Sequence, residues 1–164
     1  MLYVVIGIIL LILLWIIVKR NGFASQLDKI KNSRSDVLNI RDRLTQSINA
    51  SIKIAKAGHT AEIEGIEKLN SGEQINALSV LMENSPNLKS SAMFAQTQAE
   101  SYRLHKELDA QRRLLNSNVR LYNKDISMFP NIIVSKIFGY TKEDFIAEER
   151  LDESGELGSF QLKL

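Results

Sequence analysis

An unbroken apolar run near the N-terminus constrains this chain more than any other feature. Residues 2–18 carry no charged side chain, and Lys19 and Arg20 follow directly. These 17 residues would rise about 25 Å as an α-helix, enough with their flanks to cross a hydrocarbon core of roughly 30 Å. Because lipid offers no partner to backbone N–H and C=O groups, such a run must be helical. We predict a transmembrane anchor over residues 1–20, with membrane-spanning positions that include Leu2, Ile9, Trp15 and Val18.

A cleaved signal peptide and a buried core helix fit this run less well. A secretory signal carries positive charge before its apolar stretch and a small-x-small cleavage site after it. Here the positive residues come after the run, and Phe23 interrupts the nearest small residues. A core helix normally has one polar face, whereas this run is apolar on every side. With no cysteine, the chain cannot carry a lipid on an N-terminal Cys. We therefore expect an uncleaved anchor.

The distribution of charge around the run predicts its orientation. The basic residues Lys19, Arg20, Lys29, Lys31 and Arg34 follow the run, and only the α-amino group precedes it. By the positive-inside rule, we expect the N-terminus outside and the larger C-terminal part in the cytoplasm. The juxtamembrane residues Lys19 and Arg20 are also suited to anionic lipid headgroups, at about 1 kcal/mol per nearby residue. The sequence thus predicts a single-pass protein of the cell (inner) membrane.

The rest of the chain predicts an all-α fold in one domain. Glycine and proline are scarce, and aliphatic residues recur at helical spacing without strand-like alternation. A first helix should continue from the anchor to about Gly58, with Asn21–Gly22 either a hinge or part of a continuous helix. One stripe of that helix is apolar and should be buried: Phe23, Leu27, Ile30, Val37, Leu44, Ile48, Ile52 and Ala55.

Three further helical segments are expected. Residues 60–82 predict two short helices or one kinked helix, followed by a turn at residues 84–87. A long helix from about Ser91 to Ser127 should end before Phe129-Pro130, and a short helix over residues 131–138 should be closed by Gly139. The long helix carries a coiled-coil-like apolar seam: Leu104, Leu108, Leu115, Val119, Tyr122 and Ile126.

The composition changes after Thr141. Residues 142–164 have a net charge of −4, which leaves +6 on residues 1–141. We expect this acidic tail to be helical to about Leu151 and partly disordered beyond it.

No constellation of catalytic residues is recognisable. His59-x-x-Glu62 is a single pair of helical spacing, whereas a di-metal carboxylate bundle needs Glu-x-x-His twice, and we expect His105 to be exposed. The chain contains no G-x-S-x-G elbow and no glycine-rich phosphate loop. Its arginines are interleaved with acids, which disfavours nucleic-acid binding. We expect no enzyme activity, no catalytic or metal site, no cofactor and no small-molecule substrate.

From Pro86 to Tyr140 the chain resembles the LemA family. The family pattern reads roughly P-x-L-K-x-x-x-x-F, E-L, R-R-x-Y-N, V-x-x-Y-N-x-x-I-x-x-F-P and a final G-F/Y. It is matched in order and spacing by Asn87-Leu88-Lys89-Ser90, Phe94, Glu107-Leu108, Arg112-Arg113, Val119-Arg120, Tyr122-Asn123, Ile126, Phe129-Pro130 and Phe138-Gly139-Tyr140. The chain is similar to a divergent member: Leu115-Asn116 replaces a Tyr-Asn pair, Ser47-Ile48-Asn49-Ala50 replaces a proline-containing I-P-N-L segment, and a tryptophan expected near Ser35 is missing.

The resemblance implies an elongated antiparallel bundle of about four helices over residues 21–141, on one membrane anchor, in bacteria and without known catalytic activity. Simple roles follow for the matching residues. Phe129-Pro130 should end the long helix, Tyr122 should lie on its seam, and Asn123 should satisfy backbone groups near its end. Arg112 and Arg113 should pair with acids of a neighbouring helix or subunit.

The sequence favours a non-enzymatic scaffold or adaptor that contacts the lipid bilayer and packs helix faces, either with itself as a homo-oligomer or with another membrane protein. A transmembrane sensor is the alternative, and it is disfavoured because little of the chain is expected outside the membrane. A membrane-anchored enzyme is less consistent still with the residues.

Overall fold

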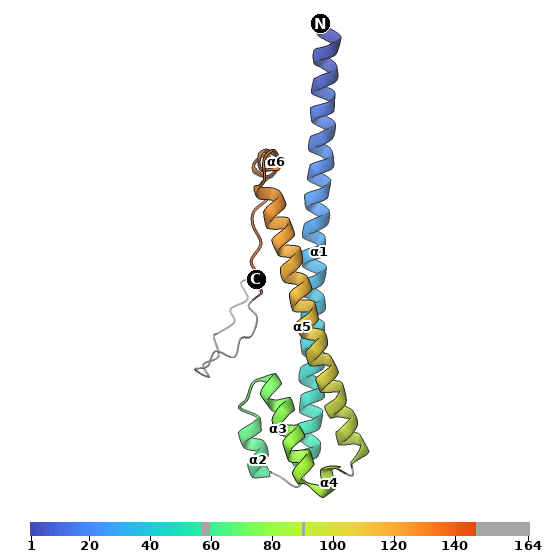
Figure 1. Cartoon of the computed structure of the whole chain (residues 1–164), viewed down its shortest axis with the longest axis vertical. Coiled ribbons are helices and arrows are strands. Elements are labelled where there is room, and N and C mark those ends of the chain that lie inside the picture. Colours follow the sequence, from blue (N-terminus) through green and yellow to red (C-terminus); the bar gives the residue numbers. More distant parts are fainter. Residues whose placement is uncertain (57–59, 90, 147–164) are drawn as a thin grey trace.

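A single helix of 55 residues, α1 (Leu2–Lys56), forms the spine of the molecule. The computed structural model describes residues 1–56, 60–89 and 91–146. α1 passes through Asn21–Gly22 without a break, which confirms the continuous helix and excludes the hinge. At 1.5 Å per residue α1 is about 80 Å long, and its N-terminal third stands clear of the other elements (Figure 1).

The predicted all-α class is confirmed, since no strand occurs in the described ranges. The elements after α1 are α2 (Thr60–Ile66), α3 (Ser71–Asn84), α4 (Pro86–Lys89), α5 (Ala92–Ser127) and α6 (Asn131–Phe138). α5 runs back along α1, α2 to α4 gather at the end far from the N-terminus, and α6 lies at the other end of α5 (Figure 1). Residues 60–84 form two short helices, which confirms one of the two alternatives for this segment.

The long contact between α1 and α5 forms most of the hydrophobic core, which buried residues of α2, α3, α4 and α6 extend. All six residues of the predicted seam on α5 are buried. On α1 the predicted stripe is buried as well, except that Leu27 is only partly covered. Burying apolar area contributes roughly 25 cal/mol per Å². The opposed stripes are therefore the main source of stability for the bundle.

Small polar side chains set the register of this antiparallel pair. Gln26 Nε2 donates to Asp125 Oδ2 at 3.0 Å, and Asn118 Nδ2 donates to Ser33 Oγ at 3.1 Å. The partners step by seven residues along each helix, as an antiparallel heptad seam requires. Further along, Ser101 Oγ donates to Ser47 Oγ at 2.9 Å. A slip of one turn would separate these buried or half-buried donors from their acceptors, which is costly.

Local caps explain where the helices begin and end. Asn70 Oδ1 accepts from Glu73 N at 3.0 Å, and the Glu73 carboxylate accepts from Asn70 N at 3.3 Å, a capping box at the start of α3. Ser91 caps α5 through Phe94 N. α6 ends at Gly139, whose φ of 72° is left-handed, as expected for a C-cap glycine.

Two expectations about local structure are wrong. The turn at residues 84–87 is replaced in part by the helical turn α4, because Pro86 suits the first position of a helix and has no N–H to satisfy. Residues 141–146 are not helical, because their backbone is bound by side chains of α5, as described below. The expected helix end at Gly58 and the rest of the tail (147–164) lie outside the described residues.

Candidate functional site

Two asparagines on α5 hold an extended segment of chain against the bundle. Asn123 Nδ2 donates to Glu143 O at 2.8 Å, and Glu143 N donates to Asn123 Oδ1 at 2.9 Å. Asn116 makes the same pair of bonds with Ile146, both at 2.9 Å. A primary amide offers one donor and one acceptor side by side, as a peptide group does. Each asparagine therefore acts as a single rung of a β-ladder.

The spacing of these rungs matches the geometry of the two segments. Asn116 and Asn123 are seven residues apart, about 10.5 Å along an α-helix. Glu143 and Ile146 are three residues apart, about 10 Å in an extended chain. An ion pair adds to the contact, since Arg34 Nη2 of α1 lies 3.2 Å from Glu143 Oε2. The extended segment thereby touches both long helices.

A second heptad stripe on α5 is exposed. Leu114 and Leu121 are seven residues apart and share one face of α5, and Met128, which caps the end of the helix, follows seven residues later. All three are about half exposed. Arg113, Arg120 and Lys124 lie beside this face and are exposed. We call these six residues the basic-apolar stripe. Exposed leucines and a methionine flanked by cations form a surface suited to an amphipathic, acidic partner.

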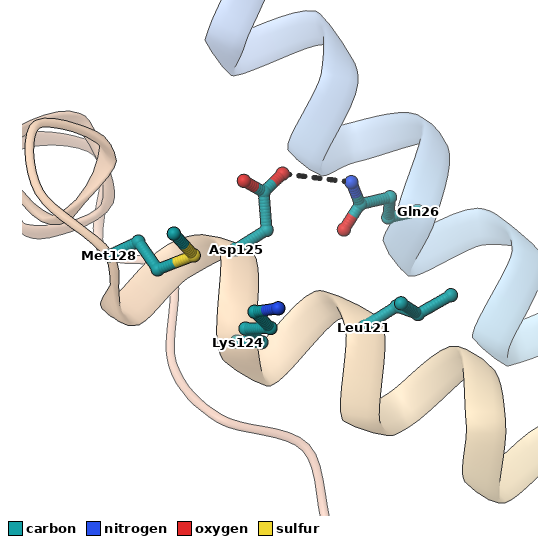
Figure 2. Close-up of a pocket in the computed structure, with 5 residues that line it drawn as sticks. All are labelled: Gln26, Leu121, Lys124, Asp125 and Met128. Atoms are coloured by element: carbon teal, nitrogen blue, oxygen red, sulfur yellow. Dashed lines mark hydrogen bonds between the residues drawn. The ribbon is translucent and has the colours of Figure 1, made fainter.

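A shallow hollow of about 300 Å³ lies between α1 and α5, at the end of the stripe nearest the C-terminus of α5. It is lined by Gln26, Leu121, Lys124, Asp125 and Met128. In Figure 2 the Gln26–Asp125 hydrogen bond bridges the two helices beside Leu121 and Met128. The hollow is large enough for one or two side chains of a partner.

The residues expected in the anchor are exposed. Leu2, Ile9 and Val18 are at least half exposed, while Trp15 is partly covered and packs against the core. α1 includes a window of mean hydropathy 2.9 that is not buried at all, so it is a candidate membrane span. Lys19 and Arg20 follow it, and the Arg20 guanidinium lies over the Phe138 ring at 5.3 Å from its centroid.

The residues matched to the LemA pattern are distributed from α4 through α5 and α6 to Tyr140. Tyr122 is buried on the seam, and burial, followed by the nearby charge of Glu143, raises the pKa of its hydroxyl. Asn123 binds backbone as expected, but that of residue 143 rather than of the helix end. Phe129 is 81% exposed, and Pro130 precedes α6.

The two arginines of the pattern differ in their surroundings. Arg112 is largely covered, and its Nη1 lies 3.8 Å from Asp109 Oδ1 on the same helix. Its pairing with an acid of a neighbouring helix or subunit stays a prediction. Arg113 is exposed and belongs to the basic-apolar stripe. Its pairing with a neighbouring subunit stays a prediction.

The described residues bring together no cluster of metal-ligating side chains. No group of three or more His, Cys, Asp or Glu side chains among them could hold an ion. His59 and the side chain of Glu62 lie outside the described residues. His105 is less exposed than expected, since it packs beside Gly72 of α3, where a Cβ would meet its ring at 3.4 Å. Its Nε2 lies 3.7 Å from Asp109 Oδ2.

Sequence reasoning missed Asn116 and the basic-apolar stripe. Asn116 was noted only where it departs from a family pattern, although its distance of seven residues from Asn123 could have identified it. Leu114, Leu121 and Met128 have the same heptad spacing as the seam and lie one position away from part of it. Spacing alone does not say which of two such stripes is buried.

A comparison with known protein families shows to which family this chain is related. A model described as the LemA family matches residues 25–155, which is most of the chain. The chain belongs to the LemA family. No curated protein and no solved structure matches it. The LemA match covers α1 from residue 25 onward, all the other helices and the extended segment, so it includes every element of the site.

Proposed function

We propose that this LemA-family chain is a non-enzymatic, single-pass scaffold or adaptor of the bacterial cell membrane. α1 would be its anchor, with the N-terminus outside and the bundle in the cytoplasm. The observation that carries the proposal is the continuity of α1 from an exposed apolar third into the packed bundle. A helix without a break holds the bundle at a defined distance from the bilayer.

The basic-apolar stripe is the surface that we propose for the partner. Its three apolar residues are each about half exposed, and two of them, Leu121 and Met128, line the hollow of Figure 2. The flanking cations Arg113, Arg120 and Lys124 favour a partner with acidic residues beside an apolar helix face. We commit to such a helix in another membrane-associated protein.

Self-association through the same stripe is less favourable. Two copies anchored in one bilayer would have their α5 helices side by side in the same direction. Arg120 and Lys124 of one copy would then face the same residues of the other. Like charges opposed in this way are destabilising.

The anchor and its orientation can be tested with one cysteine, because the native chain has none. Val80 is exposed, and α3, to which it belongs, lies at the end of the bundle far from the N-terminus (Figure 1). In intact cells, a Val80→Cys variant should resist an impermeant maleimide and react after the membrane is opened. Labelling in intact cells would reverse the proposed orientation, and release of the protein by alkaline carbonate would exclude the anchor.

The partner surface can be tested by photo-crosslinking the full chain in native membranes. A benzoylphenylalanine at position 121 should join the chain to one other protein, and the same group at position 80 should not. The joined peptide should be an amphipathic helix with acidic residues, and Arg120→Glu with Lys124→Glu should reduce the yield severalfold. Self-multiples alone, or a yield unchanged by charge reversal, would contradict this partner.

A further inference from the structure

One face of α6 covers the end of α5. Ser135 Oγ donates to Ile126 O of α5 at 3.0 Å, and Asn131 Nδ2 donates to Asp125. Val134 on the same side is fully buried. These contacts turn that face of α6 toward the bundle.

The other face of α6 is apolar and exposed. Ile133 and Ile137 are one helical turn apart, and they are 49% and 64% exposed. Each lies two residues from Ser135. Two residues correspond to roughly 160° around the helix, so both isoleucines point away from the face that binds α5. Phe129, which is more exposed still, lies two residues before the start of α6. Exposed apolar residues on such a short element need a physical explanation.

α6 lies at the level where the candidate span ends. Tyr140, two residues after α6, donates from its hydroxyl to Arg20 O at 3.3 Å, and its ring packs edge-on against Phe23 at 5.4 Å between centroids. Phe138 lies under the Arg20 guanidinium. Arg20 is only two residues, about 3 Å, beyond Val18, the last residue of the apolar run. α6 also lies across the end of α5 nearest the N-terminal third of α1 (Figure 1).

These observations favour lipid as the occupant of the exposed face. The apolar surface of α6 lies at the same height along α1 as the end of its exposed apolar run. Lys19 and Arg20 follow that run, and Lys136 lies on α6. Apolar side chains beside cations suit the boundary between acyl chains and anionic headgroups. A protein partner would have to enter the same boundary to reach Ile133 and Ile137.

We propose that α6 is an interfacial helix, with Phe129, Ile133 and Ile137 inserted at the headgroup–acyl boundary and Lys136 directed to lipid phosphates. This inference rests on the proposed anchoring by α1. A second point of attachment restricts rotation of the bundle about α1. The basic-apolar stripe is thereby presented in one direction relative to the bilayer.

Depth-dependent fluorescence quenching tests the proposal on the full chain. Single variants Ile137→Cys, Ile133→Cys, Ile9→Cys and Val80→Cys carry an NBD label in vesicles of phosphatidylcholine and phosphatidylglycerol. Nitroxide lipids, with the spin label near the headgroup or deep in the acyl chain, and aqueous iodide are the quenchers. We expect shallow nitroxide to quench labels at 133 and 137 severalfold more than a label at 80. Deep nitroxide should quench most at position 9.

The possible outcomes distinguish failure of the interfacial helix from failure of the proposed anchor. Quenching at 9 without quenching at 133 and 137 leaves the anchor intact and overturns the interfacial helix. Labels at 133 and 137 shielded from both nitroxide and iodide would mean a protein contact, which also overturns it. No nitroxide quenching at 9 would overturn both proposals. A Lys136→Glu variant should weaken shallow quenching at 137 in anionic vesicles and leave it unchanged in neutral ones.

Discussion

Asn123 illustrates how one side chain can direct a distant backbone. Its two hydrogen bonds hold residue 143 extended, although Lys142, Glu143 and Asp144 belong to a segment whose composition favours a helix. Together with Asn116, it replaces the hydrogen bonds that a local helix would have formed. The energy of these four bonds, at about 1 kcal/mol each, exceeds the differences in helix propensity.

An Asn123→Ala variant should therefore release the extended segment. The loss of two hydrogen bonds costs about 1–3 kcal/mol, so amide exchange of Glu143 should accelerate about tenfold or more. Hydrogen exchange measured by mass spectrometry or NMR checks this. Asn118→Ala is the matched control, because Asn118 bonds to Ser33 of α1 instead. Equal exchange at Glu143 in the two variants would contradict the role given to Asn123.

The raised pKa of Tyr122 predicts that the free energy of unfolding depends on pH. Burial raises the pKa of its hydroxyl, so the unfolded chain, with a tyrosine pKa of about 10, ionises first. The free energy of unfolding is unaffected by Tyr122 below about pH 10 and falls as the pH rises through the folded pKa. Tyr122→Phe should flatten this decline, as measured by urea unfolding in detergent at several alkaline pH values. Tyr102→Phe, at an exposed position, should not flatten it.

At the scale of elements, the ends of the helices are governed by single residues with local reasons. The Asn70 and Glu73 capping box starts α3, and the left-handed Gly139 ends α6 and turns the chain toward Arg20. These signals are readable from sequence because each depends on neighbours within three or four positions. The end of α6 matters most, since it places Tyr140 against α1.

Gly139→Ala should destabilise the bundle by about 1–2 kcal/mol, because an alanine at positive φ is strained. A Cβ at this position meets no atom within 4 Å, so the cost comes from the backbone alone. Gly22→Ala has equally open surroundings but helical dihedrals, and it should stabilise α1 by about 0.5–1 kcal/mol. Thermal unfolding followed by circular dichroism compares the two variants. Shifts of the same sign would contradict the left-handed requirement.

At the scale of the whole molecule, stability depends on one extended contact between two long helices. Leu115 is fully buried in this contact, and its neighbour Leu114 is half exposed on the basic-apolar stripe. The two leucines therefore separate a structural role, at Leu115, from the binding role that we propose for Leu114. The bundle can therefore lose side chains of the stripe without losing its fold.

Leu115→Ala should lower the free energy of unfolding by about 2–5 kcal/mol through lost burial and a cavity. Leu114→Ala should change it by less than about 0.5 kcal/mol, because the side chain is at the surface. Urea unfolding of the full chain in detergent measures both values. If Leu114→Ala proved as costly as Leu115→Ala, the stripe would be part of the core, and the proposed partner surface would be wrong.

Much of the architecture was predictable from local patterns. The apolar run, the buried stripe of α1, the seam of α5 and the short helix closed by Gly139 all follow from spacing and turn chemistry. The proposed site was less predictable. Asn116 and Asn123 bind residues 30 and 20 positions away, and no periodicity in the sequence identifies those partners.

The sequence by itself determined that this chain is helical, that α1 carries an apolar third, and which residues of α1 and α5 form the core. Those properties depend on the period of the helix and on the identity of near neighbours. Only the tertiary structure decided that Leu114, Leu121 and Met128 remain exposed, that residues 141–146 are extended, and that α6 lies beside Arg20. Each of these depends on which of several chemically similar faces meets a distant segment, and that choice is made by packing and hydrogen bonding between elements.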